Sequence, residues 1–203
     1  SQSMATAMDL ALSLAQANIL MKAIMLAAGV GSILGNSETS RQPKVLLQFD
    51  GRSLLERHID FLQRQGIDEL ILAVGFNRMA IEQEIESLGA SEFVRTVVNP
   101  DFEAGSILTL WALRDELCSG GPVLLMDADL RYEEQLLDRL VSSRHNNCAL
   151  LDRVVIPDEE AVKLCIRDGE IVEFRKWVSI DFDFNGESVG FFKLSPEVAH
   201  SLV

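Results

Sequence analysis

Residues 24–35 read Ile-Met-Leu-Ala-Ala-Gly-Val-Gly-Ser-Ile-Leu-Gly, and this stretch decides the fold of the chain. Its apolar start predicts a strand buried on both faces, and the small residues after it predict a tight turn. Without bulky side chains, the backbone N–H groups of such a turn are able to face an anion. A polar loop then leads to Pro43-Lys44, where the lysine adds a mobile positive charge. The segment suits a nucleoside triphosphate, although a strand followed by Gly-x-Gly is often only a turn.

Strand-like and helical segments alternate along the rest of the chain. Buried strands are expected at 22–28, 70–74, 93–98, 122–126, 148–152 and 190–194, with a short extended segment at 45–49. Helices are expected from the capping box Ser53-Leu-Leu-Glu56 to Gly66, at 80–88, 105–117 and 133–141, and from Ser195 onward. Asp168-Gly169 predicts a hairpin turn between strands at 162–167 and 171–177. This order predicts an α/β fold of three layers, with an open, mostly parallel sheet between helices.

Several turns that follow these strands are expected to meet in one pocket. In open parallel sheets, ligands bind beyond the carboxyl ends of the strands. The loop at Gly29, the pair Gly75-Phe76, Asn99 and the segment 127–129 all come directly after buried strands. They are therefore expected to lie along one edge of the sheet.

Two carboxylates stand at the end of the strand at 122–126, in the sequence Asp127-Ala128-Asp129. On an extended segment, alternate residues point to the same side, so the two carboxylates repel each other unless a cation or hydrogen-bond donors lie between them. Mg²⁺ prefers carboxylates together with phosphate oxygens of a substrate. The motif therefore indicates a metal site. A solvated acidic turn, or Asp129 as the N-cap of the next helix, is the alternative.

These motifs resemble the signature of the nucleotidyltransferases that make CDP-, UDP- or dTDP-activated metabolites. That signature is Leu-Ala-Ala-Gly-x-Gly-x-Arg-Leu, a variable loop and then Pro-Lys. The resemblance implies a Rossmann-like nucleotidyltransferase fold with a β-hairpin insertion. It also implies that the triphosphate is held by Lys44 and by the segment made of Leu26, Ala27, Ala28, Gly29, Val30, Gly31 and Ser32. The chain departs from the signature at Ile33, where the family has arginine.

The same resemblance assigns roles to residues farther along. It makes Asp129 the principal metal ligand with Asp127 assisting, and Lys44, Asp129 and Lys176 the catalytic residues. Lys176 would contact the phosphate of the acceptor, although an exposed hairpin lysine is the other interpretation. Glu187 would contact the acceptor or be a surface turn residue. The remaining expected nucleotide contacts are Gly75, Phe76, Asn99 and Ser106, of which Ser106 is alternatively a helix cap.

The implied reaction is Mg²⁺-dependent transfer of a nucleotidyl group from a nucleoside triphosphate to a small phosphorylated acceptor, with release of pyrophosphate. The layout is most similar to the phosphocholine and aminoalkylphosphonate cytidylyltransferases, which makes CTP the favoured donor. The acceptor is then phosphocholine-like, a phosphonate or a sugar phosphate. Because of Ile33, a second interpretation stays open, in which the protein is a degenerate nucleotide-binding or regulatory module without turnover. A glycosyltransferase that uses nucleotide sugars also has an Asp-x-Asp site, but the Pro43-Lys44 pair argues against it.

The balance of charges narrows the classes of partner. Asp and Glu outnumber Lys and Arg by 31 to 18, which gives a net charge of −13 at pH 7. Such acidity argues against nucleic acid and against anionic membranes, because both need basic patches. Three scattered cysteines, at 118, 148 and 165, indicate reduced thiols and a cytoplasmic protein. The sequence does not decide between a monomer and a homodimer. The histidines at 58, 145 and 200 show no metal or triad spacing and are expected to be structural or exposed.

One nucleotidyltransferase domain is expected from residue 22 to residue 203. Residues 1–21 are interpreted as the remnant of an expression tag followed by a mildly apolar extension, which resembles neither a signal peptide nor a membrane span. By resemblance, the domain lacks its C-terminal end, where the family carries a second metal carboxylate. Asp181 and Asp183 are the nearby substitutes.

Overall fold

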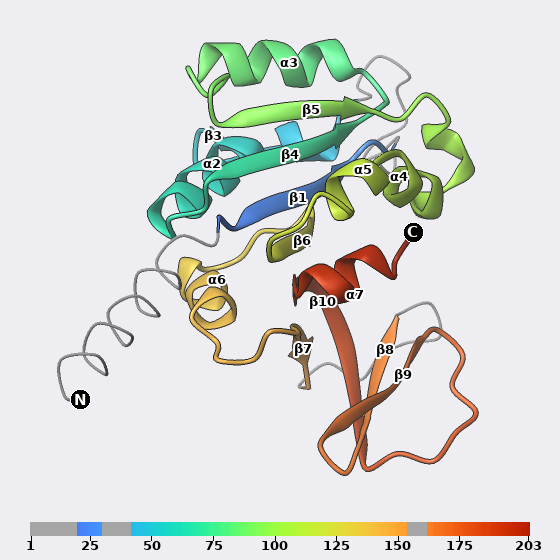
Figure 1. The fold of residues 1–203 in the computed structure, drawn as a ribbon. Helices are drawn as coiled ribbons and strands as arrows, with labels where there is room; N and C mark the ends of the chain where they lie inside the picture. The colour runs from blue at the N-terminus through green and yellow to red at the C-terminus, as the bar shows by residue number, and fades with distance from the viewer. Residues whose placement is uncertain (1–19, 30–41, 154–161) are drawn as a thin grey trace, which may run out of the picture.

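The computed structural model describes residues 20–29, 42–153 and 162–203. At its centre is an eight-stranded sheet in which seven strands follow the order β5-β4-β1-β6-β10-β8-β9, with β7 paired to β10 (Figure 1). The half that comes first in the sequence is parallel: β4 and β6 flank β1, and β5 lies outside β4. These four strands are β1 (Lys22–Ala27), β4 (Glu69–Val74), β5 (Val94–Val98) and β6 (Val123–Asp127).

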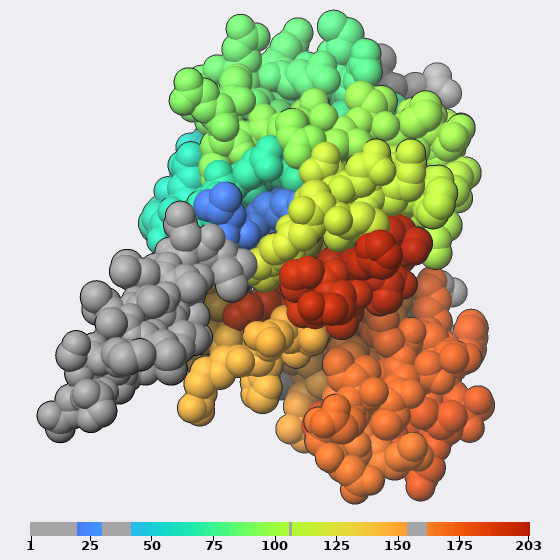
Figure 2. Space-filling model, viewed as in Figure 1, coloured from blue at the N-terminus to red at the C-terminus, as the bar shows by residue number. Residues whose placement is uncertain are grey.

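The other half of the sheet is antiparallel and is built around one long strand, β10 (Phe184–Leu194). β10 pairs with β6, with β7 (Cys148–Asp152) and with β8 (Lys163–Arg167). β8 forms the expected hairpin with β9 (Glu170–Arg175) through a turn in which Asp168 and Gly169 have φ of 53° and 81°. Figure 2 shows the orange segment that contains β8 and β9 as a lobe at one end of the molecule. The sequence predicted only the last five residues of β10, because its first half is not continuously apolar.

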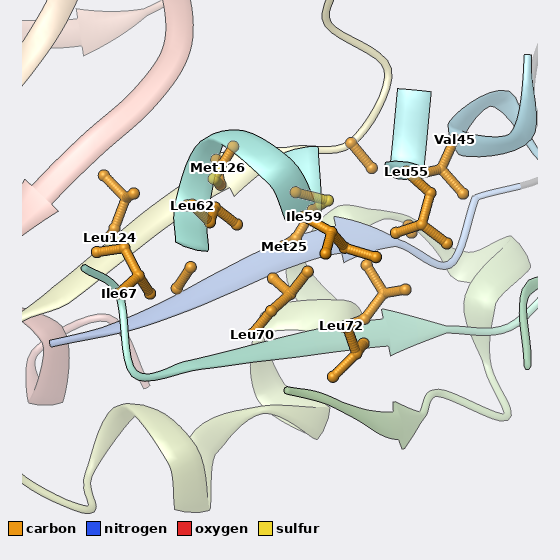
Figure 3. Packing of buried hydrophobic residues seen from close by; sticks show 14 of the residues in the cluster. Met25, Val45, Leu55, Ile59, Leu62, Ile67, Leu70, Leu72, Leu124 and Met126 are labelled. Carbon is orange, nitrogen blue, oxygen red and sulfur yellow. The ribbon is translucent and has the colours of Figure 1, made fainter. Parts of the chain in front are cut away.

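Helices cover both faces of the sheet, so the predicted three-layer α/β architecture is confirmed. On one face, apolar residues of α2 (Leu54–Arg64), α3 (Arg78–Ser87) and α6 (Glu134–Val141) share a core with alternate residues of the strands. Figure 3 shows Leu55, Ile59 and Leu62 of α2 packed over Met25 and Leu72. On the other face, α5 (Arg114–Leu117) and α7 (Pro196–His200) contribute to a second core.

Three local predictions concern helix ends and turns. The Ser53 half of the predicted capping box is present, because the hydroxyl of Ser53 accepts from the Glu56 N–H at 3.0 Å, whereas the Glu56 carboxylate accepts from Arg52 at 2.8 Å. The extended segment expected at 45–49 is wrong in its first half, where a 3₁₀ turn, η2 (Lys44–Leu46), buries Val45 and Leu46 before β2 (Gln48–Phe49) pairs with β3 (Arg52–Ser53). The prediction of a single helix at 105–117 is also wrong.

That predicted helix is two elements, α4 (Ser106–Ala112) and α5, separated at Leu113. Leu113 is fully buried, and its backbone has φ of −91° and ψ of 6°, outside the helical range. The break directs α5 onto the sheet, where Leu117 is also buried. It leaves α4 and the preceding turn η3 (Phe102–Ala104) beside the carboxyl end of β1 (Figure 1).

Candidate active site

A cavity of about 440 Å³ opens at the carboxyl ends of β1 and β6. Two parallel strands therefore end at the same opening, as the α/β architecture requires of a ligand site. The residues around it come from the end of β1 and the first turn after it (Ala28–Gly29), from η2, from the η3–α4 segment, and from the acidic turn (Asp127–Asp129) at the end of β6. They are Leu26, Ala27, Ala28, Gly29, Lys44, Val45, Phe102, Gly105, Thr109, Asp127, Ala128 and Asp129. Of the turns expected to form one pocket, the cavity joins that at Gly29 with the segment 127–129, and Lys44 also lines it.

Lys44 and Asp129 form an ion pair at this cavity. The amine of Lys44 donates to Oδ2 of Asp129 at 2.7 Å. Both side chains keep more than a third of their surface exposed, 38% for Lys44 and 39% for Asp129. Exposed pairs of this kind contribute about 0–1 kcal/mol to stability. The two charges are therefore available to a ligand at little cost to the fold.

Asp127 is the last residue of β6 and also faces the cavity. Partial burial raises the pKa of Asp127, and the negative charge of Asp129 raises it further. Gly190 of β10 lies directly against this carboxylate, so that a Cβ at Gly190 would clash with Oδ2 of Asp127. A cation at this place would relieve the repulsion between the two carboxylates.

The donor atoms at the acidic turn fit a magnesium ion that shares its coordination with a substrate. Two carboxylates are hard oxygen ligands of the type that Mg²⁺ prefers. Within the described ranges, no group of three or more His, Cys, Asp and Glu side chains forms a metal cage. Mg²⁺ commonly keeps several waters and takes phosphate oxygens as further ligands, so two carboxylates are a sufficient protein contribution.

Asn99 and Gly75, both expected nucleotide contacts, support the cavity wall and do not line it. The buried amide of Asn99 donates to the hydroxyl of Thr109 at 3.0 Å and accepts from the N–H of Asp101 at 3.0 Å. These bonds tie the segment after β5 to α4. A Cβ on Gly75 would lie 2.5 Å from Cβ of Phe102 and 2.8 Å from the carbonyl oxygen of Ala28, so only glycine lets Phe102 approach. Phe102 is a cavity residue that the sequence did not single out.

Phe76 lies next to this wall, with its ring 6.4 Å from the ring of Phe102. Gly105 and Thr109 line the cavity and were also missed, together with Val45 and Ala128. The sequence signal for Gly105 is the glycine itself, since its φ of 107° is a backbone conformation that side chains disfavour. Sequence alone gives no comparable signal for Thr109, which reads as an ordinary helix residue.

The remaining expected site residues lie away from this cavity or outside the described residues. Lys176 follows β9, where its backbone oxygen accepts from the amine of Lys163 at 3.0 Å. Glu187 lies in β10 opposite Asp152 of β7. Neither Lys176 nor Glu187 belongs to the cavity lining. Val30, Gly31, Ser32, Ile33 and Arg41 fall outside the described residues, as do residues 1–19 of the expected N-terminal extension.

Asp181 and Asp183, the suggested substitutes for a second metal carboxylate, lie between β9 and β10 and contact the β8–β9 hairpin. Oδ2 of Asp183 accepts from the backbone N–H of Asp168 at 2.8 Å, and the carbonyl of Asp181 accepts from Arg167 at 3.3 Å. Both therefore hold the hairpin.

His58 is a residue near the site whose importance the sequence did not reveal. It lies on α2, is 1% exposed, and contacts the backbone of Ala128 between the two carboxylates. The prediction that His58 is structural or exposed agrees with its burial. It contained no information about the contact with Ala128.

The sheet, the cavity at its carboxyl edge and the Lys44–Asp129 pair define an α/β domain with a charged cavity where β1 and β6 end. The chain belongs to the family described as the MobA-like NTP transferase domain, whose model matches residues 23–169. The family that the motifs resembled, the nucleotidyltransferases, is thereby confirmed.

Several curated proteins are similar to this chain, and two of them are described here. The CMP-5'-(3-aminopropyl)phosphonate synthase of Streptomyces rubellomurinus is 30% identical over 154 residues, which are 76% of this chain and 24% of that protein. The choline-phosphate cytidylyltransferase of Streptococcus pneumoniae is 33% identical over 110 residues, which are 54% of this chain and 44% of that protein. The chain thus spans less than half the length of these relatives.

The fold is also found among solved structures. The inositol-1-phosphate CTP transferase from T. maritima superposes with a TM-score of 0.69 at 22% identity, over 90% of this chain and 73% of that one. In the part of the chain that the structure describes, no helix has the length and apolar character needed to cross a membrane.

Proposed function

We propose that this domain transfers a nucleotidyl group from a nucleoside triphosphate, with CTP as the favoured donor, to a small phosphate or phosphonate acceptor. The observation that carries the proposal is the Lys44–Asp129 pair at the cavity where β1 and β6 end. A positive and a negative side chain at 2.7 Å give one group for phosphate oxygens and one for a cation. Membership in the NTP transferase family favours a triphosphate over a nucleotide sugar.

The residues of the cavity have separate tasks in this reaction. The first turn, through the backbone at Ala28 and Gly29, would hold the triphosphate, and Lys44 would leave Asp129 to bind its phosphate oxygens. Asp129 and Asp127 would hold Mg²⁺, which supplies neutralisation of the phosphate charge when it is bound. Little covalent work is then required of the protein, because positioning and charge stabilisation lower the barrier.

The bond changes are those of an in-line displacement. An oxygen of the acceptor attacks the α-phosphorus, and a new P–O bond forms. The bond from the α-phosphorus to the oxygen that bridges it to the β-phosphorus breaks, and pyrophosphate leaves with that electron pair. From the family resemblance, Lys176 and Glu187 are proposed to contact the acceptor. Both lie on the antiparallel half of the sheet, beyond the described cavity lining.

The names of the two curated relatives support the choice of donor and acceptor. One makes a CMP-aminopropylphosphonate and the other is a cytidylyltransferase for choline phosphate. In both, a cytidylyl group is joined to a small phosphorus acid that carries a nitrogen group. We therefore place CTP first among donors, and an aminoalkyl phosphate or phosphonate ahead of sugar phosphates among acceptors.

Pyrophosphate release is the direct test. The protein with Mg²⁺ is assayed with CTP, UTP, dTTP, ATP and GTP, each against phosphocholine, 2-aminoethylphosphonate and sugar 1-phosphates, and ³¹P NMR identifies the product. The expected result is CTP-dependent release with a CMP-linked product. Calorimetric binding of CTP without turnover on any acceptor would favour the regulatory alternative. Transfer from a nucleotide sugar would favour a glycosyltransferase.

A further inference from the structure

His58 connects the core of the protein to the acidic turn at Asp127–Asp129. Its Nε2 lies 3.1 Å from the carbonyl oxygen of Ala128, and its Nδ1 lies 3.2 Å from the hydroxyl oxygen of Tyr132. The two rings stack with centroids 5.4 Å apart. His58 comes from α2, some 70 residues before its partner Ala128, so the contact joins two elements that are distant in sequence.

These contacts define which ring nitrogen carries the proton. A carbonyl oxygen only accepts, so Nε2 of His58 must be the donor to Ala128. In a neutral imidazole, the other nitrogen is then an acceptor, and the Tyr132 hydroxyl donates to Nδ1. Burial lowers the pKa of His58 to about 4, which keeps the ring neutral at pH 7. Tyr132 is itself held edge-on against Phe191 of β10, with ring centroids 4.7 Å apart.

The carbonyl that His58 holds belongs to the peptide between Ala128 and Asp129. The orientation of that peptide determines the direction in which the Asp129 side chain leaves the backbone. On the other side of the turn, Gly190 lies against the carboxylate of Asp127. The acidic turn is therefore held from the core by His58 and from β10 by Gly190.

A purely structural role accounts less well for a histidine at this place. The position is 1% exposed and faces the apolar core, where a Leu side chain would avoid the cost of burying two polar nitrogens. Both nitrogens have partners, and one partner is the backbone between the two proposed metal ligands. Partners behind metal ligands typically change metal affinity or activity by about 10–100-fold.

We infer that His58 is a positioning residue: through the Ala128 carbonyl it sets the direction in which Asp129 faces the cavity beside Asp127. Its effect on activity rests on the proposed nucleotidyl transfer. Its effect on the geometry of the turn and on divalent-ion binding does not. His58→Leu removes the donor, whereas His58→Gln keeps an N–H donor and a carbonyl acceptor in one side chain.

The first measurement is independent of turnover. Wild type, His58→Leu and His58→Gln are titrated with Mn²⁺, and paramagnetic broadening of the Asp127–Asp129 amide signals reports binding at the turn. We expect His58→Leu to weaken Mn²⁺ binding about tenfold and His58→Gln to restore it to within about threefold of wild type. The imidazole ¹⁵N shifts of wild type should show the Nε2-protonated tautomer.

The second measurement separates positioning from stability. Leu62→Ala on the same helix removes a fully buried apolar side chain and should lower the urea concentration at the midpoint of unfolding without weakening Mn²⁺ binding. In the pyrophosphate assay, His58→Leu should raise the Mg²⁺ concentration at half-maximal rate, and His58→Gln should reverse most of that change. A folded His58→Leu protein with wild-type Mn²⁺ affinity overturns the inference. A wild type that binds Mn²⁺ at the turn but turns over no triphosphate overturns the proposed function alone.

Discussion

The amine of Lys44 reaches Oδ2 of Asp129 at 2.7 Å, although the two residues are 85 positions apart in sequence. The first begins the turn η2 and the second follows β6, so the pair closes the cavity from two elements. The ligands proposed for this cavity would separate the two charges, because phosphate attracts the lysine and a cation attracts the carboxylate. On that proposal, the pair is a resting arrangement of two groups that would act on different parts of a substrate.

Replacing Lys44 by methionine is expected to weaken catalysis far more than folding. A charge-assisted contact to phosphate contributes about 1.5–3 kcal/mol, so kcat/KM should fall by about 10–100-fold. The Lys44–Asp129 pair is more than one-third exposed at both ends, and its loss should change the free energy of unfolding by less than about 1 kcal/mol. Steady-state kinetics and urea unfolding measure the two effects. Arg139→Met, at an exposed position on α6, is the control for loss of a surface charge.

Gly190→Ala should disturb Asp127, whereas the same substitution at another glycine with a positive φ should not. At Gly190, with φ of 75°, a Cβ would clash with the Asp127 carboxylate, whereas Gly51, with φ of 77°, has open space around its Cβ. Both substitutions incur a backbone cost of about 1–2 kcal/mol. Only Gly190→Ala should also lower Mg²⁺-dependent activity, by about tenfold or more. Equal activity losses in the two variants would show that the backbone conformation, and not the contact with Asp127, accounts for the effect.

The parallel half of the fold was predictable because its signals are local. β1, β4, β5 and β6 are short apolar runs bounded by turn residues, and each was expected within a residue or two of its observed bounds. Their carboxyl ends meet at one edge in any parallel sheet, which is why the turn at Gly29 and the segment 127–129 could be assigned to one pocket, whereas Lys44 was assigned by its motif. At this edge of the sheet, the sequence motifs and the strand topology both indicated the same pocket.

The rest of the site depends on contacts between distant segments, which no local pattern encodes. Phe102 reaches the cavity because Gly75, 27 positions earlier, has no side chain. His58 has the helical spacing of a core residue, and its contact with Ala128 follows only from the packing of α2 against β6. The long strand β10 was predicted only in part, because Phe184–Glu187 pairs with β8 through its backbone and has little apolar periodicity.

The stability of the protein should contain an acid-sensitive contribution from His58. Its pKa is lowered to about 4 by burial, against an ordinary value near 6.5, so the unfolded chain binds the proton more tightly than the folded protein does. Stability from this residue is therefore present above pH 6.5 and is lost as pH falls toward 4. Urea unfolding should show about 2 kcal/mol more destabilisation from pH 7 to pH 5 in wild type than in His58→Gln. Identical pH dependence in the two proteins would place the folded-state pKa near its ordinary value.

Ile33→Arg tests whether the departure from the nucleotidyltransferase signature limits the protein. In the family signature this position is arginine, and a guanidinium here would add a charge-assisted contact to the triphosphate, worth about 1.5–3 kcal/mol. The expected result is a fall of about tenfold or more in the KM for CTP, with KM for the acceptor unchanged. Arg41→Met is the companion variant, since Arg41 belongs to the same loop. If Ile33→Arg leaves KM for CTP unchanged and Arg41→Met raises it, Arg41 already supplies the missing cation, and the isoleucine is no barrier to turnover.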